Sequence, residues 1–312
     1  MEVLRTPDER FENLADWPHA PNYVDDLDGY EGVRVHYVDT GEGAEAGEGA
    51  KAGEAAKAGE GAFLLLHGQP TWGYLYRRMI PIFARAGRVV APDWLGFGRS
   101  DKPAHEADVT FHMHRNMMLR LIERLSLERI TLVVQDWGGL LGLTLPMEAP
   151  ERYERLLVMN TALATGRSPG PGFQAWRDYA NAHPDLDIAR LMRRACPHLS
   201  EAEAAAYAAP YPDATYKAAV RRFPQMVMVE PDMEGVETSR RAVRWWREEW
   251  RGESFMAVGA QDPVLGPDVM ERMRGVIRNC PEPMVLEEAG HFVQEWGERV
   301  AEAALERFGE GP

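Results

Sequence analysis

The sequence has only two cysteines among its 312 residues, Cys196 and Cys280. They stand far apart, in neither a CxxC pair nor a setting typical of a nucleophile, which predicts neither a disulfide framework nor a metal site. No stretch approaches the roughly 18 apolar residues that a membrane span requires. The N-terminal residues mix charges with aromatic side chains and lack the apolar run of a secretory signal. These absences predict a soluble protein of the reducing cytoplasm.

The chain has fewer basic than acidic residues. The chain has 35 Lys and Arg against 49 Asp and Glu, a formal net charge of −14. A field of that sign repels phosphate backbones and anionic membrane surfaces, so we expect neither nucleic acid nor a membrane as a partner. The hydrophobic fraction of 45% is ordinary for a globular protein. The length allows one large α/β core with an inserted lobe and a sizeable buried pocket.

Residues 41–62 lack large apolar side chains altogether, since they contain only Gly, Ala, Glu and Lys. Such a segment has little to bury that could offset the entropy of ordering it. Ala, Glu and Lys favour a helix, but the recurring glycines oppose one. We therefore predict a flexible surface insert.

Outside the insert, short β-type runs alternate with helical patterns in which apolar residues recur every three or four positions. The expected strands are Val33–Val38, Phe63–His67, Arg88–Ala91, Ile130–Gln135, Leu156–Met159, Phe255–Gly259 and Met284–Leu286. The expected helices include Met113–Leu125, Gly138–Glu148, Val269–Val276 and Val300–Phe308. This alternation predicts an α/β fold with a mostly parallel central sheet covered by helices on both faces.

The pattern changes from about Thr161 to Met233, where the chain is rich in Pro, Ala and Arg and has no convincing strand. We interpret this stretch as a helical cap inserted between two strands. The predicted division is a first core part over residues 1–160, a cap over 161–233 and a second core part over 234–312. A cap above the carboxyl ends of the strands would exclude water from a site there.

Residues 133–139 carry the sharpest local signal, VVQDWGG. A buried-strand pattern runs into a tight turn and then a helix, as in a nucleophile elbow, with Asp136 where lipases and esterases place Ser. The residue two before the nucleophile is usually small, and here it is Val134. An Asp that merely caps a helix after a strand would give the same local pattern, so this motif leaves both interpretations open.

Two other segments favour the catalytic interpretation. The HGQPTW segment, which begins at His67, can aim a backbone N–H toward the site and complete an oxyanion hole with the N–H of Trp137. His291, in EAGHF after the last expected strand, supplies a base in the chain order nucleophile, acid, histidine. The other eight histidines receive no role, and the pair His112 and His114 lacks a third metal ligand at suitable spacing.

The acid that orients the base should leave a strand end, where its carboxylate accepts the other ring N–H. Asp262 occupies such a point. The strand before it ends at Asn160, whose neutral amide could not balance a developing imidazolium charge. Asp262 is therefore the better candidate, although an Asp before Pro263 is also a common turn residue.

These motifs together resemble the haloalkane dehalogenases, and most closely the subgroup with an Asp nucleophile, a late Asp acid and two halide-binding tryptophans. The resemblance covers nearly the whole chain except residues 41–62. The segments that carry it are RTPDERFENL, PNYVDDLDGY, HGQPTWGYLYRRMIP, APDWLGFGRSDKP, VVQDWGG, FQAWRDYA, GAQDPVLGPDVM and AGHFVQEWGE.

The resemblance implies an α/β-hydrolase fold without a cofactor or metal. It implies hydrolysis of 1-haloalkanes to a primary alcohol, halide and a proton through an alkyl ester of Asp136. The resemblance also assigns a role to each site residue. Asp136 would be the nucleophile, His291 the general base, and Asp262 the acid that orients His291. The indole N–H groups of Trp137 and Trp176 would bind the halide, and the backbone N–H groups of Gln69 and Trp137 would form the oxyanion hole. The subgroup often has Glu where this chain has Gln69, which puts a side-chain role there in doubt but keeps the backbone N–H. We expect a small halogenated aliphatic substrate, released halide and a monomer.

Three rival functions stay open at this point. An epoxide hydrolase shares the Asp, His and Asp arrangement but uses cap tyrosines as acids, and the cap contains Tyr179, Tyr207, Tyr211 and Tyr216. A fluoroacetate-type dehalogenase would need an Arg where Trp137 stands. A non-enzymatic protein of the same fold normally loses part of the triad, and this chain retains all three candidates.

Overall fold

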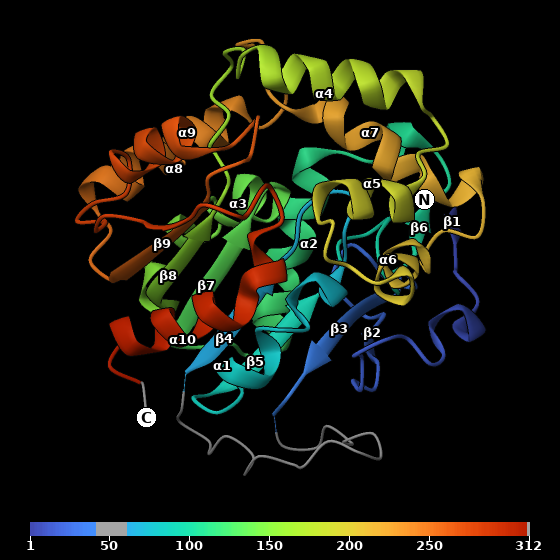
Figure 1. Ribbon diagram of the computed structural model, residues 1–312, viewed down its shortest axis with the longest axis horizontal. Coiled ribbons are helices and arrows are strands. Elements are labelled where there is room, and N and C mark those ends of the chain that lie inside the picture. The colour runs from blue at the N-terminus through green and yellow to red at the C-terminus, as the bar shows by residue number, and fades with distance from the viewer. Residues whose placement is uncertain (42–60, 311–312) are drawn as a thin grey trace.

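A twisted eight-stranded sheet forms the centre of the protein, whose computed structural model describes residues 1–41 and 61–310 (Figure 1). Its strands stand in the order β10-β9-β8-β7-β4-β5-β3-β2. Their bounds are β2 Asn22–Val24, β3 Val35–Asp39, β4 Ala62–Leu66, β5 Arg88–Pro92, β7 Ile130–Gln135, β8 Tyr153–Met159, β9 Glu253–Gly259 and β10 Met284–Leu286. All pairs from β10 to β5 are parallel, whereas β3 pairs antiparallel with both β5 and β2. The predicted fold class is confirmed.

The central strands are buried along their whole length because helices cover both faces. Every residue of β4 and of β7 is buried, and both are near-continuous apolar runs, as expected for parallel strands covered on both sides. The expected bounds of β7 and β10 match the observed ones, and the other expected strands overlap theirs. The sequence analysis missed the short strands β1 (Val3–Leu4), β2 and β6 (Lys102–Pro103), which are too brief to show a periodic pattern. The predicted insert at 41–62 falls almost entirely outside the described residues.

Two apolar clusters lie on opposite faces of the sheet. Val133 belongs to the cluster that includes residues of α1 and α10, whereas Val134 belongs to the larger cluster that includes residues of α2, α3 and α8. Neighbouring strand residues point to opposite faces, which is why one strand serves both clusters. The helices outside residues 161–233 are α1 Ile80–Phe83, α2 Phe111–Arg124, α3 Trp137–Gly142, α8 Val236–Glu248, α9 Pro267–Arg274 and α10 Gly297–Arg307.

The helix after Asp136 is shorter than the predicted range Gly138–Glu148. It ends at Gly142 and is followed by a short 3-10 turn that starts at Pro146. Proline lacks the N–H that an α-helix would need at that position, so the chain tightens there. The 3-10 turns of the structure are η1 Asp8–Phe11, η2 Gly73–Tyr76, η3 Glu106–Asp108, η4 Pro146–Glu148, η5 Pro150–Arg152, η6 Ala214–Lys217 and η7 Val293–Trp296.

Residues 161–233 lie between β8 and α8 and hold four α-helices and no strand. The helices are α4 Pro171–Ala182, α5 Ile188–Ala195, α6 Glu201–Ala208 and α7 Ala218–Met226. Figure 1 shows α4, α5 and α7 above the end of the sheet to which β7 and β8 point. That end collects the loops that follow the parallel strands, where ligands of open α/β sheets bind.

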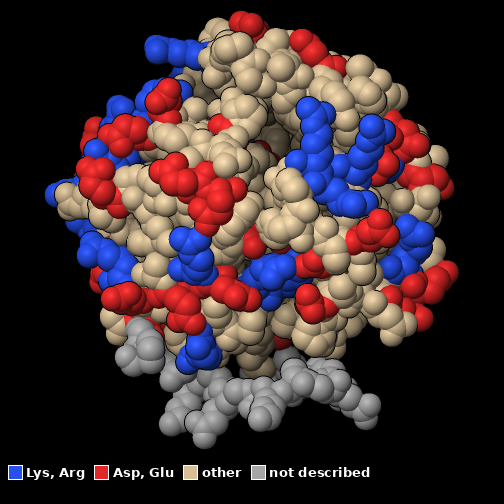
Figure 2. Space-filling model, in the orientation of Figure 1, with Lys and Arg blue, Asp and Glu red and all other residues tan. Residues whose placement is uncertain are grey.

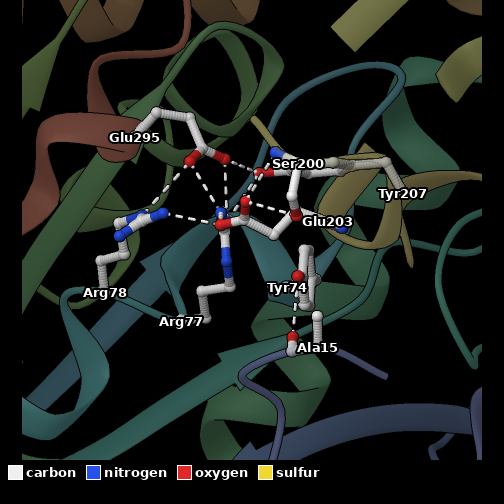
Figure 3. A network of polar contacts seen from close by, with 8 residues as sticks. All are labelled: Ala15, Tyr74, Arg77, Arg78, Ser200, Glu203, Tyr207 and Glu295. Carbon is white, nitrogen blue, oxygen red and sulfur yellow. Dashed lines mark hydrogen bonds and ion pairs between the residues drawn. The ribbon is translucent and has the colours of Figure 1, made fainter. Parts of the chain in front are cut away.

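A buried ionic cluster links this helical segment to the core, and Figure 3 shows its members converging. We call Arg77, Arg78, Glu203, Tyr207 and Glu295 the Arg77 cluster. The Arg77 guanidinium binds both carboxylate oxygens of Glu295, each at 2.8 Å, and also Glu203 of α6 at 2.9 Å. The Tyr207 hydroxyl donates to Glu295 as well. Because Glu295 lies in η7, the cluster ties α6 to the turn that follows His291.

Among the described residues, none of the helices combines the length and the apolar character needed to cross a bilayer.

Candidate active site

Asp136 stands at the bend between β7 and α3 with φ 51° and ψ −125°. A non-glycine residue with positive φ is strained, and such strain is typical of a nucleophile elbow. The bend is tight: a Cβ at Gly138 would lie 1.8 Å from the carbonyl oxygen of Leu66. Thr161 anchors the bend from the next strand, since its hydroxyl donates to the Asp136 carbonyl at 2.7 Å. The elbow thus requires glycine at position 138, because a larger residue there would clash with β4.

The loop after β4 supplies a hydrogen bond to the Asp136 carboxylate. The backbone N–H of Gln69 donates to Asp136 Oδ1 at 2.8 Å. A Cβ at Gly68 would lie 2.3 Å from the same oxygen, so glycine is what allows the loop to approach. Trp137 opens α3, and the first N–H groups of a helix have no partner one turn earlier. The side chain of Gln69 turns away toward α7, where its amide donates to the carbonyl of Val220 at 3.2 Å.

His291 lies between two carboxylates. Its Nδ1 is 2.8 Å from Asp262 Oδ2, and its Nε2 is 3.6 Å from Asp136 Oδ2. Asp136, Asp262 and His291 follow β7, β9 and β10 respectively, so the parallel sheet brings their loops to the same edge. One carboxylate oxygen of Asp136 is therefore held by Gln69, and the other faces the imidazole.

Asp262 is fixed by three donors. Besides His291, the Asn160 side chain donates to Oδ2 at 3.0 Å, and the Val264 N–H donates to Oδ1 at 2.8 Å. Burial alone would raise the pKa of Asp262, but the imidazole and these hydrogen bonds outweigh it and lower the pKa to about 2. Asp262 is thus held as a carboxylate.

The pKa of His291 is raised, in contrast to that of Asp262. Burial alone would lower the pKa of His291, but the charges of Asp262 and Asp136 and their hydrogen bonds outweigh it and raise the pKa to about 10. The two carboxylates therefore favour the protonated form of the imidazole. Loss of either negative charge would lower its pKa again.

The two tryptophans come from different layers. Trp137 is 3% exposed, and its ring packs against Phe223 of α7 with centroids 4.6 Å apart. Trp176 is half-buried on α4, where it stacks on Tyr179. Because α4 packs against α7, Trp176 lies on the helix next to the one that covers Trp137. Five of the six predicted site residues thus form one connected group, and Trp176 belongs to the helical segment above it.

Comparisons with known proteins identify the family to which the chain belongs. Residues 61–298 match the model of the alpha/beta hydrolase fold family. Haloalkane dehalogenase 1 of Mycobacterium tuberculosis is 43% identical over 312 residues, which cover 98% of each chain. The haloalkane dehalogenase of Psychrobacter cryohalolentis is 39% identical over the full length of both chains. The chain belongs to the haloalkane dehalogenase family. Members of this family are hydrolases that act on carbon–halide bonds.

A solved dehalogenase structure extends the comparison to three dimensions. The haloalkane dehalogenase from Paraglaciecola agarilytica NO2 is 47% identical, covers 98% of both chains and superimposes with a TM-score of 0.90. That protein is described as tetrameric, so the expectation of a monomer is wrong. The physical reason is that a homo-oligomer interface is a self-complementary surface patch, which sequence periodicity and motifs do not reveal.

The rival epoxide hydrolase function is not favoured for this dehalogenase. The relatives named above are dehalogenases, and two of the candidate tyrosines have other partners. The Tyr207 hydroxyl donates to Glu295, and the Tyr211 hydroxyl donates to the carbonyl of Pro70 at 3.4 Å. Both side chains are buried, and their hydroxyls donate to these other groups.

The sequence analysis missed three residues of the dehalogenase site. Asn160 supports Asp262, Phe223 covers Trp137, and Gln135 contacts His291. Asn160 had a usable signal, because it ends the strand on which some relatives place the acid. Gln135 also had one, because a polar residue that ends a buried strand requires a partner. Phe223 gave none, since an aromatic residue in an amphipathic helix is ordinary.

Proposed function

We propose that Asp136 is the nucleophile of this dehalogenase and that it hydrolyses 1-haloalkanes to a primary alcohol, halide and a proton. One observation carries the proposal. Asp136 stands on a strained bend with Oδ1 on the Gln69 N–H and Oδ2 facing His291 at 3.6 Å. The two oxygens of one carboxylate therefore have different surroundings, which suits two successive steps.

In the first step, Oδ2 attacks the carbon that bears the halogen, and the carbon–halogen bond breaks as the carbon–oxygen bond forms. A carboxylate is already ionised at neutral pH and needs no base for this displacement. The products are an alkyl ester of Asp136 and a halide ion. Oδ1 stays on the Gln69 N–H throughout.

The halide needs donors and no proton, because it is a weak base. An indole N–H donates and cannot accept, which suits an anion in a dry pocket. Trp137 and Trp176 are the proposed donors. Support for Trp137 is its position directly after the nucleophile. Support for Trp176 is its place on α4, which packs against the helix that covers Trp137.

In the second step, water attacks the ester carbonyl carbon while His291 Nε2 takes its proton. Alkylation has by then removed the negative charge of Asp136, one of the two charges that raise the pKa of His291. The first step therefore lowers the pKa of His291, so the ring can release its proton to solvent, as the proton counted among the products, and then act as a base. The oxyanion forms on Oδ1, where the N–H groups of Gln69 and Trp137 stabilise it. As the intermediate collapses, the imidazolium, stabilised by Asp262, gives its proton to the departing oxygen, which leaves as the alcohol. The carboxylic acid left on Asp136 then passes its proton to His291, which restores the starting state.

The helical segment 161–233 is the proposed cap, between core parts 1–160 and 234–312. Its helices α4 and α7 lie above the site, and a dry site strengthens every electrostatic interaction in it. The face drawn in Figure 2 is hollowed between the positions of α3 and α4, which offers a route for a small apolar substrate.

A cytoplasmic location is proposed as well, supported by the free thiols of Cys196 and Cys280.

The experiment measures halide release from 1-bromobutane and the intact mass of the protein. We expect Asp136→Ala to release no halide, because no nucleophile remains. We expect His291→Phe to release one equivalent of bromide and then stop, with the mass increased by one butyl group. An unmodified His291→Phe protein with normal turnover would contradict the proposal, and so would sustained activity of Asp136→Ala.

A further inference from the structure

Gln135 is a buried polar residue in contact with His291 that the mechanism above does not use. It is the last residue of β7, directly before Asp136, and none of its surface is exposed. Strand residues alternate between faces, so its side chain lies on the same face as Val133, toward η7 and α10. It therefore contacts His291 from the face of the sheet that η7 and α10 cover.

The orientation of the Gln135 amide follows from its partners. Its Nε2 lies 2.9 Å from the carbonyl oxygen of His291. A carbonyl oxygen can only accept, so the NH2 end of the amide must face it. The same NH2 group lies 3.1 Å from Nε2 of the His291 ring. Its second N–H therefore opposes the ring nitrogen that acts on water.

This contact distinguishes the two protonation states of His291. An amide N–H facing Nε2 is favourable when that nitrogen has a lone pair and unfavourable when it carries a proton. The titratable groups whose charges act on the ring are Asp262 after β9 and Asp136 after β7, and both favour the proton. Gln135 is the neighbour that opposes them. Nδ1, hydrogen-bonded to Asp262, then keeps the proton of the neutral ring.

A second glutamine supports the first. Gln294, in η7, is fully buried and its Nε2 points at Oε1 of Gln135 at 3.4 Å. The pair links the nucleophile strand to the turn that follows the base. We infer that Gln135, supported by Gln294, is a positioning residue that holds His291 in its neutral tautomer for hydrolysis of the alkyl ester. This inference rests on the proposed function, because it concerns only the second step.

The test separates the two steps with Gln135→Met, which keeps the length of the side chain and removes its N–H groups. Bromide release in the first turnover should stay within about twofold of wild type, because Asp136 is unchanged. Ester hydrolysis should slow by about tenfold to a hundredfold, the range expected for a misplaced catalytic group, and butyl-enzyme should accumulate. The acid limb of the hydrolysis rate should move to higher pH, because loss of the opposing N–H raises the pKa of His291.

Controls keep the outcomes distinct. Thr131→Val changes a buried polar residue on the same strand that does not contact His291, and it should leave both steps unchanged. Gln294→Met should slow hydrolysis in the same direction by a smaller factor and covers the case in which Gln135→Met does not fold. Equal slowing of both steps, or an acid limb that does not move, would overturn the inference. Failure of His291→Phe to gain the butyl group would instead overturn the proposed function.

Discussion

The Arg77 cluster and the group formed by Asp136, His291 and Asp262 are two charged networks that differ in how completely their charges are paired. In the Arg77 cluster, one guanidinium binds both oxygens of Glu295, and Tyr207 binds the same carboxylate (Figure 3). At the site, the nearest cation to Asp136 Oδ2 is the His291 ring at 3.6 Å, beyond a good hydrogen bond. A closed network can stabilise a fold, whereas a carboxylate that is to react must keep one oxygen free.

The two networks also differ in the exposure of their side chains. The side chains of Arg77 and Glu295 are 1% and 0% exposed, while those of His291 and Asp136 are 21% and 18% exposed. Burial makes an ion pair costly to break, because a lone charge left inside the protein has no solvent to stabilise it. We therefore expect substitutions in the Arg77 cluster to act on stability and substitutions around His291 to act on rate.

The largest expected effect comes from Asp262→Asn, which tests whether substitutions around His291 act on the reaction rate. The variant removes the carboxylate that fixes Nδ1–H and balances the imidazolium, so ester hydrolysis should fall by about 10³- to 10⁴-fold. The first-turnover burst of bromide should remain, since Asp136 is intact. Stopped-flow halide release beside intact-protein mass measures both. A lost burst with a normal melting temperature would place Asp262 in the first step and contradict the assignment.

Arg77→Met comes next and acts on the other network. It leaves Glu295 buried without its guanidinium partner, which typically costs about 3–5 kcal/mol of unfolding free energy. Urea unfolding should show that loss, while the folded fraction keeps its first-turnover bromide burst. Arg78→Met is the matched control, because Arg78 is 29% exposed and its removal leaves Arg77 in place. Equal destabilisation by the two variants would break the proposed distinction.

The smallest effect is expected from Glu203→Gln, at the edge of the Arg77 cluster. Burial would raise the pKa of Glu203, but hydrogen bonds from Arg77 and Ser200 outweigh it and lower the pKa to about 2. Because the folded-state pKa lies below the unfolded value, the stabilisation is present at neutral pH and disappears as pH falls from about 4 to 2. The variant should lose about 1 kcal/mol at pH 7 and less at about pH 3, measured by urea unfolding. The same loss at both pH values would contradict the role of its charge.

Much of the fold followed from apolar periodicity. The run that became β7 matches its strand because a buried parallel strand reads as a continuous apolar stretch with clear ends. The short apolar run of β10, at the edge of the sheet, also matches its strand. The predicted helix after Asp136 was too long, since Pro146 interrupts the pattern at a point where apolar spacing continues. Strands of two or three residues, such as β1 and β6, carry too few residues for any period to emerge.

Some residues of the candidate site could be predicted from the sequence, and others could not. Asp136, Gln69 and Trp137 could be predicted because the elbow and the HG turn are local motifs. The supporting contacts could not, because their partners are distant in the sequence: Gln135 and His291 are 156 residues apart, and Asn160 and Asp262 are 102 apart. A polar side chain shows that it needs a partner, but it does not show which one.

The sequence by itself determined the alternation of strands and helices, the bend that only glycine allows after Asp136, and the chemical types of the reacting groups. These properties depend on residues near one another in the chain, where sterics and side-chain chemistry act directly. Only the tertiary structure decided that Oδ1 and Oδ2 of Asp136 have different neighbours, that Gln135 contacts His291, and that Arg77 pairs with both oxygens of Glu295. Those relations depend on how the parallel sheet brings the ends of distant strands together, and packing alone sets the distances at that edge.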